Sequence, residues 1–241
     1  FAGLLNSYKD FNINMYYGYY PGNYVRDYKD KDGTGEYEQY TYDKNLYRLY
    51  SYYKLTEKDI PYLYLQVEDY FFNEYFTEYD GRATTIGVGW KHDFLSFYLK
   101  LFYYYRKFDT SNVHYDISQI SPSDRITDPK YESNIYDIEY QNKKLSLYRG
   151  TKFRPFFGLR FEERFYTTDL PVQVSPYQST RAENRYKISL GSEFFLTNDL
   201  SATLNYTHNL RDVSSDYSNL MKYKNYKQNT IKLDFNYKIK F

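Results

Sequence analysis

The sequence predicts an all-β fold: a transmembrane, antiparallel up-and-down β-barrel of about ten strands, with twelve as the alternative. Three observations predict it. Apolar and polar side chains alternate along most of the 241 residues, the connections between alternating segments are in turn short and long, and aromatic residues gather at segment ends. Nothing comparable occurs at helical spacing, so the β period is the dominant signal.

The composition narrows the class of protein. Aromatic residues make up 23% of the chain, with 36 Tyr and 18 Phe, beside 26% charged residues and a mean hydropathy of −0.84. This aromatic content argues against disorder, and no run of about 18 apolar residues could form a transmembrane helix. Having 11 Gly and no Cys, the chain is neither collagen-like nor a disulfide scaffold. Its formal net charge of +1 argues against a nucleic-acid partner.

The C-terminal segment shows the alternation most clearly. From Thr230 to Phe241, every second residue is apolar or aromatic and the residues between them are polar. Turning this strand over by one residue would expose Lys232, Asp234 and Lys238 to the apolar side, at a cost of several kcal/mol. The same period predicts strands over residues 11–20, 40–53, 61–74, 83–91, 94–106, 134–149, 153–167, 185–195, 200–208 and 227–241.

The connections alternate in length, which is typical of an outer-membrane barrel with short periplasmic turns and long extracellular loops. An even number of strands then places both chain ends on the periplasmic side. Residues 1–10 are expected to form an N-terminal periplasmic segment and residues 11–241 the barrel. The long connections are 21–39, 107–133, 168–184 and 209–226, the intermediate one is 75–82, and the short ones are 54–60, 92–93, 150–152 and 196–199.

The segment 134–152 leaves the strand count open. Tyr136, Ile138 and Tyr140 hold one phase of the alternation, whereas Leu145 and Leu147 hold the other. Either a β-bulge shifts the phase within one long strand, or the polar residues between the two sets form a separate turn. The second choice requires one more strand and leads to the twelve-stranded alternative.

These features give the chain a resemblance to bacterial outer-membrane β-barrel proteins. The last ten residues look like the C-terminal signal by which the barrel-assembly machinery recognises its clients, with Phe241 at the end and Ile239 and Tyr237 at alternate positions before it. The Gly often found upstream in that signal is missing. The resemblance implies integration in the bacterial outer membrane, with outer-membrane lipid, lipopolysaccharide and the assembly machinery as partners.

The phase of the alternation turns a set of basic side chains toward the barrel interior. They outnumber the inward acids, which indicates a narrow channel biased toward anions. The alternative is an interior salt-bridge lattice that plugs the lumen, since side chains just fill a barrel of about eight strands. The candidates for lumen lining and selectivity are Lys100, Arg106, Arg154, Arg160, Arg164, Arg185, Lys187, Lys232 and Lys238.

Catalytic and metal-binding patterns are weak. His208, with Asp212 four residues on, is the pair nearest to the rim chemistry of an outer-membrane protease, but no paired acids around a water can be identified. His92 falls in a predicted turn and His114 in a loop. The acidic stretch Asp27–Glu38 lacks EF-hand spacing. We therefore expect no enzyme activity, no metal and no cofactor.

The favoured function is a porin-like channel for small solutes, and two alternatives remain. One is an adhesive, partner-binding or complex-subunit barrel with a plugged lumen, because the long outer loops are rich in Tyr and loops of that size need a reason. The other is an outer-membrane protease or lipase.

Overall fold

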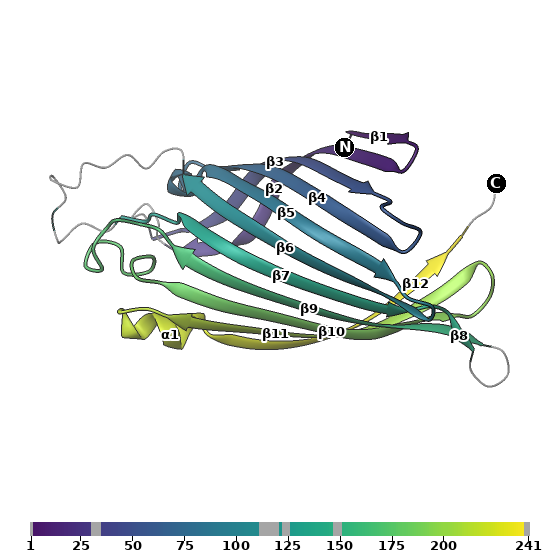
Figure 1. The fold of residues 1–241 in the computed structure, drawn as a ribbon. Coiled ribbons are helices and arrows are strands. Elements are labelled where there is room, and N and C mark those ends of the chain that lie inside the picture. Colours follow the sequence, from purple (N-terminus) through teal and green to yellow (C-terminus); the bar gives the residue numbers. More distant parts are fainter. Residues whose placement is uncertain (1, 30–34, 111–120, 122–125, 147–150, 239–241) are drawn as a thin grey trace.

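The computed structural model describes residues 2–29, 35–110, 121, 126–146 and 151–238. They form one antiparallel sheet in which strands that follow one another in the chain are hydrogen-bonded neighbours, and the short β8 pairs with β9 (Figure 1). A 3-10 turn, η1 (Thr77–Tyr79), and a helix, α1 (Ser218–Lys224), lie outside the sheet. The strands are β1 (Ala2–Tyr8), β2 (Phe11–Lys29), β3 (Tyr37–Tyr53), β4 (Asp59–Phe72), β5 (Gly81–Asp93), β6 (Phe97–Thr110), β7 (Tyr131–Asn142), β8 (Leu145–Ser146), β9 (Lys152–Tyr166), β10 (Ala182–Phe195), β11 (Leu200–Ser214) and β12 (Tyr226–Tyr237).

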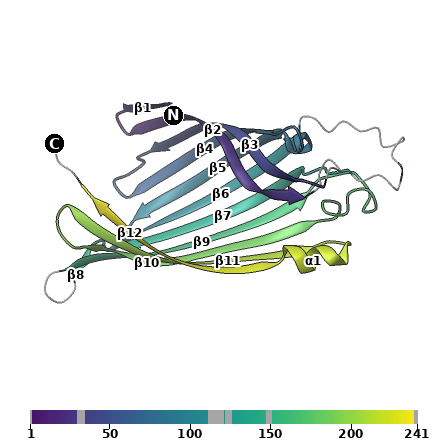
Figure 2. The same cartoon turned by 180° about the vertical axis from the view of Figure 1, so that it is seen from behind.

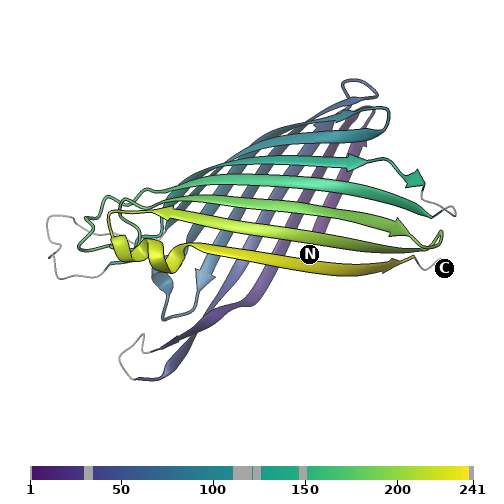
Figure 3. The same cartoon turned by 90° about the horizontal axis from the view of Figure 1, so that it is seen from below.

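The predicted all-β, up-and-down topology is confirmed, but the sheet is open. It curls into a trough whose edges, β1 with β2 on one side and β12 on the other, are not paired with each other in the described residues (Figures 2 and 3). The edge strand β1 covers only part of β2, since Ala2 is opposite Tyr17 and Tyr8 is opposite Phe11. The remainder of β2 therefore has a free edge. No helix among the described residues is long and apolar enough to cross a membrane.

All ten predicted strands are present, and β1 is an eleventh that the sequence did not predict. Residues 2–8 were expected to precede the barrel, yet they form a hairpin with β2 through a turn in which Lys9 has a φ of 53°. The adjacent Leu4 and Leu5 break the alternation, so period two gives no signal there. Ala2 lies opposite Tyr17, partway along β2.

Several strands run further toward the long loops than predicted. β2 ends at Lys29 rather than near residue 20, and β11 at Ser214 rather than near residue 208. The pairing of β2 with β3 continues past two register shifts, between Tyr20 and Asn23 and between Tyr24 and Arg26. These extensions carry no apolar stripe. The backbone hydrogen bonds between the strands therefore continue beyond the residues whose alternation predicts a strand.

The uncertain segment after residue 134 is resolved as a break. β7 ends at Asn142, and the Lys143 N–H donates to the Ser96 carbonyl at 2.8 Å. The chain then forms the two-residue β8 on the neighbouring β9, with Leu145 opposite Phe153. A break therefore separates the first phase from Leu145, whereas Leu147 lies outside the described residues. In the part of the chain that the structure describes, the sheet has eleven longer strands and the short β8.

The register divides the side chains into two faces. We call the concave side the inner face, because rings from β4 and β6 meet over β5 on this side, with centroids of Tyr62 and Phe102 5.5 Å apart. The convex side is the outer face. One rung of the inner face passes from β2 to β10 through Tyr16, Arg48, Gln66, Thr85, Arg106, Ser133, Arg164 and Glu183.

Glycines let inner-face aromatic rings lie along the sheet. A Cβ on Gly89 would come 2.1 Å from the Phe102 ring, and one on Gly87 would come 2.2 Å from the Tyr104 ring. Both rings of β6 therefore occupy the space that side chains on β5 would otherwise fill. This arrangement keeps the wall thin, because each ring lies over its neighbour instead of standing upright on the sheet.

The best-buried side chains gather at the end of the sheet that carries the long connections, which we call the loop end. Leu170, Val174 and Leu220 are each 1% exposed. They come from the β10-preceding loop and from α1, and the Ile126 N–H donates to the Val174 carbonyl at 3.1 Å. The described parts of these loops thus pack together. The opposite, turn end is closed by short hairpins such as 196–199, where Thr197 Oγ1 accepts from the Asp199 and Leu200 N–H groups.

Replacing Gly89 with Ala should lower the free energy of unfolding by about 1–3 kcal/mol, because the added methyl collides with the Phe102 ring. Gly158 is the matched control on the same face: a Cβ there would meet only ordinary contacts, the nearest being Ser189 Cβ at 3.7 Å. Gly158→Ala should change stability by about 0.5 kcal/mol or less. Urea unfolding followed by Trp90 fluorescence measures both, and equal effects would contradict the ring-over-glycine arrangement.

Candidate functional site

The inner face collects the basic residues that the sequence analysis singled out. The register places eight of the nine candidates there: Lys100, Arg106, Arg154, Arg160, Arg164, Arg185, Lys187 and Lys232. The ninth, Lys238, follows β12 at the turn end, where its N–H donates to the Asp199 carbonyl at 2.8 Å. The inner face is therefore the candidate site.

Ion pairs on this face run along the wall. Lys100 Nζ lies 2.7 Å from Glu139 Oε2 on the next strand, and Arg160 Nη1 lies 3.1 Å from Asp137 Oδ2. Arg154 pairs with Glu193 on β10 in the same way. Among the described residues, each ion pair of the inner face links two residues of one strand, of adjacent strands, or of two strands with one strand between them. They do not cross from one wall of the trough to the other.

Glu68 is the most enclosed acid of the central strands. It lies 3.2 Å from Lys44 Nζ and 2.7 Å from Arg106 Nη1, and it is buried. Arg106 also donates to the Tyr131 hydroxyl at 3.0 Å and reaches Glu68 across β5. Because a buried charge is tolerated only with partners, this group needs all its members.

Sequence reasoning missed the inward bases of β3. Lys44 and Arg48 share the inner face, and Arg48 Nε donates to Gln66 Oε1 at 2.9 Å. Tyr occurs on both faces of β3, so its alternation left the facing undetermined. The cross-strand register supplies what the pattern lacked.

Six aromatic rings form a continuous patch on the inner face of β3, β4 and β6. Tyr50 and Tyr62 have ring centroids 5.3 Å apart, as do Tyr64 and Tyr104, and Phe102 lies 5.7 Å from Tyr104. Tyr52 completes the patch beside Tyr62. The patch borders the charged wall, because Phe102 is opposite Asp137 in the register. The aromatic patch therefore lies between the Glu68 ion pairs at the loop end of these strands and the ion pairs of β7 and β9.

The loop end of the inner face is strongly positive. Glu183 is 1% exposed and is held between Arg181 and Arg185, whose Nε donates to it at 2.7 Å. Burial alone would raise the pKa of the Glu183 carboxyl, but Arg185 and Arg181 outweigh it and hold that pKa below its ordinary value. Lys224 of α1 lies in the same positive environment. Burial, which is the larger cause, and the charges of Arg181 and Arg211 lower the pKa of its ammonium group.

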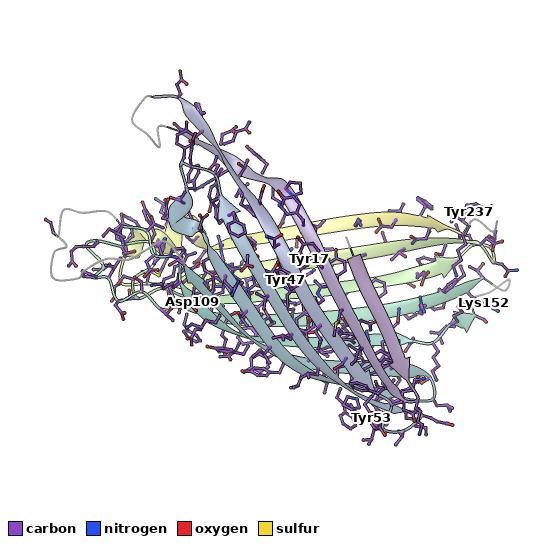
Figure 4. All side chains as sticks on the ribbon, turned by 90° about the horizontal axis from the view of Figure 1, so that it is seen from above. Tyr17, Tyr47, Tyr53, Asp109, Lys152 and Tyr237 are labelled. Carbon is purple, nitrogen blue, oxygen red and sulfur yellow. The ribbon has the colours of Figure 1, made fainter. Side chains whose placement is uncertain are left out.

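The outer face is apolar and exposed. Val88, Leu190 and Leu233 are 54%, 49% and 57% exposed, and Tyr17 and Tyr47 lie side by side on this face with ring centroids 5.2 Å apart (Figure 4). We call this stripe the apolar belt. Its largest exposed members are Met15, Tyr17, Tyr47, Leu63, Leu65, Ile86, Val88, Trp90, Leu101, Tyr103, Tyr136, Leu190, Leu204, Tyr206, Ile231, Leu233 and Phe235.

The apolar belt crosses the sheet obliquely. The rung that starts at Met15 reaches Asp212 on β11, eight strand steps away. The apolar outer segment of β11 is instead centred on Leu204, eight residues closer to the turn end. The belt therefore moves by about one residue for each strand it crosses, which is a tilt of about 35° at 3.3 Å per residue and 4.8 Å between strands.

The remaining predicted sites are placed as follows. Tyr237 ends β12 on the outer face, while Ile239 and Phe241 lie outside the described residues, as does His114. The Nδ1 of His208 lies 2.7 Å from Asn229 Oδ1, so its hydrogen-bond partner is Asn229 and not Asp212. His92 is the next-to-last residue of β5, and its Nδ1 lies 2.6 Å from Asp59 Oδ1.

Within the described parts of the chain, no group of three or more His, Cys, Asp or Glu side chains could hold a metal ion. Part of the acidic stretch Asp27–Glu38, residues 30–34, lies outside those parts.

The depressed pKa of Glu183 predicts acid sensitivity. Its ion pairs stabilise the fold fully above the ordinary Glu pKa of about 4.3, and this contribution is lost as the pH falls through the lower folded-state pKa. Glu183→Gln should therefore cost about 3 kcal/mol or more near pH 7, and this difference from wild type should shrink below about pH 4. Urea unfolding across this pH range tests it. Asp212→Asn, an exposed outer-face change on β11, should keep the wild-type profile; the same profile for Glu183→Gln would refute the assignment.

The comparisons leave the family open. The chain matches no protein-family model, and it shows no significant similarity to a curated protein or to a solved structure.

Proposed function

We propose that this protein is an integral β-barrel of a bacterial outer membrane that conducts small solutes through a narrow, anion-biased channel. The observation that carries the proposal is the oblique apolar belt on the outer face. A soluble monomer rarely exposes an apolar patch larger than a few hundred Å², whereas here large apolar side chains are exposed on strands from β2 to β12.

The tilt of the belt supports a membrane in particular. Strands of membrane barrels are inclined by about 35–45° to the membrane normal, so a level hydrocarbon slab must cross the rungs of their sheet obliquely. The shift of about one residue per strand is close to the lower end of this range. Burial against another protein domain would not require a constant shift across eight strand steps.

In a membrane the two free edges of the sheet must be paired, since an unpaired N–H or C=O group in hydrocarbon costs several kcal/mol. β12 runs antiparallel to β2, and the part of β2 beyond Tyr17 is not covered by β1. We infer that these two edges join in the membrane. The ring from β2 to β12 then has ten spanning strands, an even number that closes with antiparallel pairing.

Three features of the inner face favour an open, anion-biased lumen over a plugged one. The ion pairs follow the wall. The rings of Phe102 and Tyr104 lie over glycines rather than projecting. Basic side chains exceed acidic ones, and Arg181, Arg185 and Arg211 concentrate the excess at the loop end. A positive mouth raises the local concentration of anions.

A partner-binding barrel is the second candidate, and the packing of the loops favours it. Leu170, Val174 and Leu220 are buried as in a folded domain, and such loops can present a fixed surface. The exposed Tyr177 lies there, with its ring centroid 5.9 Å from that of the half-buried Tyr217. A barrel without conductance whose loop end binds a protein would support this candidate instead.

Two neighbouring substitutions on β10 test the membrane proposal. Leu190→Arg on the apolar belt should destabilise the protein by about 2–4 kcal/mol in a bilayer, where Arg faces hydrocarbon. Ser189→Arg, one residue away on the inner face, should cost far less. Folding in lipid vesicles, measured by urea titration, gives both values. In a water-soluble protein the exposed Leu190 would tolerate Arg, and a negligible effect would reject the membrane assignment.

Channel activity is tested in planar bilayers under a salt gradient. Wild type should conduct, with a reversal potential that shows anion preference, because bases exceed acids on the inner face. Lys187→Glu should shift the reversal potential toward cations, whereas Lys222→Glu on the exposed surface of α1 should shift it much less. Absence of conductance would reject the channel, and cation preference of the wild type would reject its anion bias.

A further inference from the structure

A cavity of about 480 Å³ lies against the inner wall, over β7, β9, β10 and β11. This volume is in the range of small-molecule sites, about 300–1,000 Å³. Its lining combines aromatic, neutral polar and charged side chains, among them Phe156, Gln141, Ser189, Asn205, Arg160 and Lys187. The cavity therefore offers a stacking surface together with several hydrogen-bonding groups.

The aromatic surface is built by a glycine. A Cβ on Gly191 would come 2.4 Å from Phe156 Cζ, so the Phe156 ring lies over the backbone of β10 at this point. The Phe156 side chain also lines the cavity. Tyr98 lines the cavity from β6, and its hydroxyl is fixed by a hydrogen bond to Gln141. The Phe156 ring is a surface on which the apolar face of another ring can stack, whereas the ammonium groups of Lys91 and Lys100 lie over the Tyr98 ring.

The cavity lining holds two acids and two bases, and one of the bases, Lys187, has no ion pair among the described residues. Asp137, Arg160 and Lys187 form one rung across β7, β9 and β10. Arg160 pairs with Asp137 at 3.1 Å, and Glu139 pairs with Lys100 at 2.7 Å. Lys187 is exposed and forms no ion pair with another described residue. Arg160 and Lys187 lie directly opposite each other, and two like charges in this position repel. An anion beside Lys187 would reduce this repulsion.

We propose that this cavity is a binding subsite for a sugar ring that carries a carboxylate. The Phe156 ring would stack on the C–H face of the sugar, Lys187 would hold the carboxylate, and Gln141, Ser189 and Asn205 would bond its hydroxyls. A planar aromatic acid would use the ring and the lysine but would leave these neutral groups without partners. The inference rests on the proposed channel for its biological sense, while the binding itself can be measured without conductance.

Calorimetric titration of the detergent-solubilised protein with digalacturonate, maltose and benzoate is the test. Wild type should bind digalacturonate in preference to the other two. Lys187→Gln should weaken digalacturonate binding about tenfold or more and leave maltose unchanged, because the charge-assisted bond is lost. Phe156→Ala should weaken both sugars. The control Lys232→Gln removes an inner-face lysine that is paired with Asp234 outside the cavity, and it should change neither affinity.

The outcomes separate the two proposals. No binding of digalacturonate, or equal binding by wild type and Lys187→Gln, overturns the subsite even if the protein conducts. Binding of benzoate as tight as that of digalacturonate overturns the sugar assignment. Binding in a protein that shows no conductance would uphold the subsite and reject the channel. Phe156→Leu is a second variant for the stacking surface: it keeps an apolar side chain but removes the flat ring, and it should weaken the binding of both sugars while Lys187 remains.

Discussion

An unbroken antiparallel register is the constraint on which the rest of this structure depends. Rungs run without a shift from β3 to β11, so every side chain on these strands is assigned to one face. A slip of one residue in any strand would send its charges to the apolar side. The polar inner wall and the apolar belt are therefore two consequences of the same pairing.

The wall of the trough is kept thin by two different means. Glycines on β5 and β10 allow rings from the neighbouring strands to lie flat, and acids on the wall hold the long basic side chains beside them. Without the glycines the aromatic rings would project from the wall, and without the acids the long basic side chains would project from it. Together they leave space against the wall, and the cavity beside Phe156 is part of that space.

The parts of the fold that the sequence predicted are those where one face is apolar. In β12 and β10, the alternation of side chains predicted both the strand and the direction of its faces, and the basic residues of the inner face follow from this. β1 escaped prediction because Leu4 and Leu5 are adjacent, and the outer part of β2 escaped because its residues have no apolar stripe. Lys44 and Arg48 were missed because Tyr is compatible with either face.

The candidate cavity could not be predicted from the sequence for a related reason. Gln141, Phe156, Lys187 and Asn205 come from four strands, and only the cross-strand register brings them to one place. From the sequence alone, a glycine within a strand indicates only a less stable strand, because the ring that lies over it is not known. Gly158 and Gly191 look alike in the sequence, yet only Gly191 has a ring over it.

The obliqueness of the belt also shapes the rim at the loop end. Suppose that the apolar belt lies in one plane, as it would in a membrane. From the centre of the belt toward the loop end, β2 then runs from Met15 to Lys29, about 46 Å of strand, whereas β11 runs from Leu204 to Ser214, about 33 Å. The rim is thus higher on the side of β2 and β3. Tyr24 and Tyr37 on this side are 57% and 67% exposed. A large molecule approaching from the loop end would therefore contact the extended ends of β2 and β3, with these two tyrosines, before it reached the basic side chains at the loop end of the inner face.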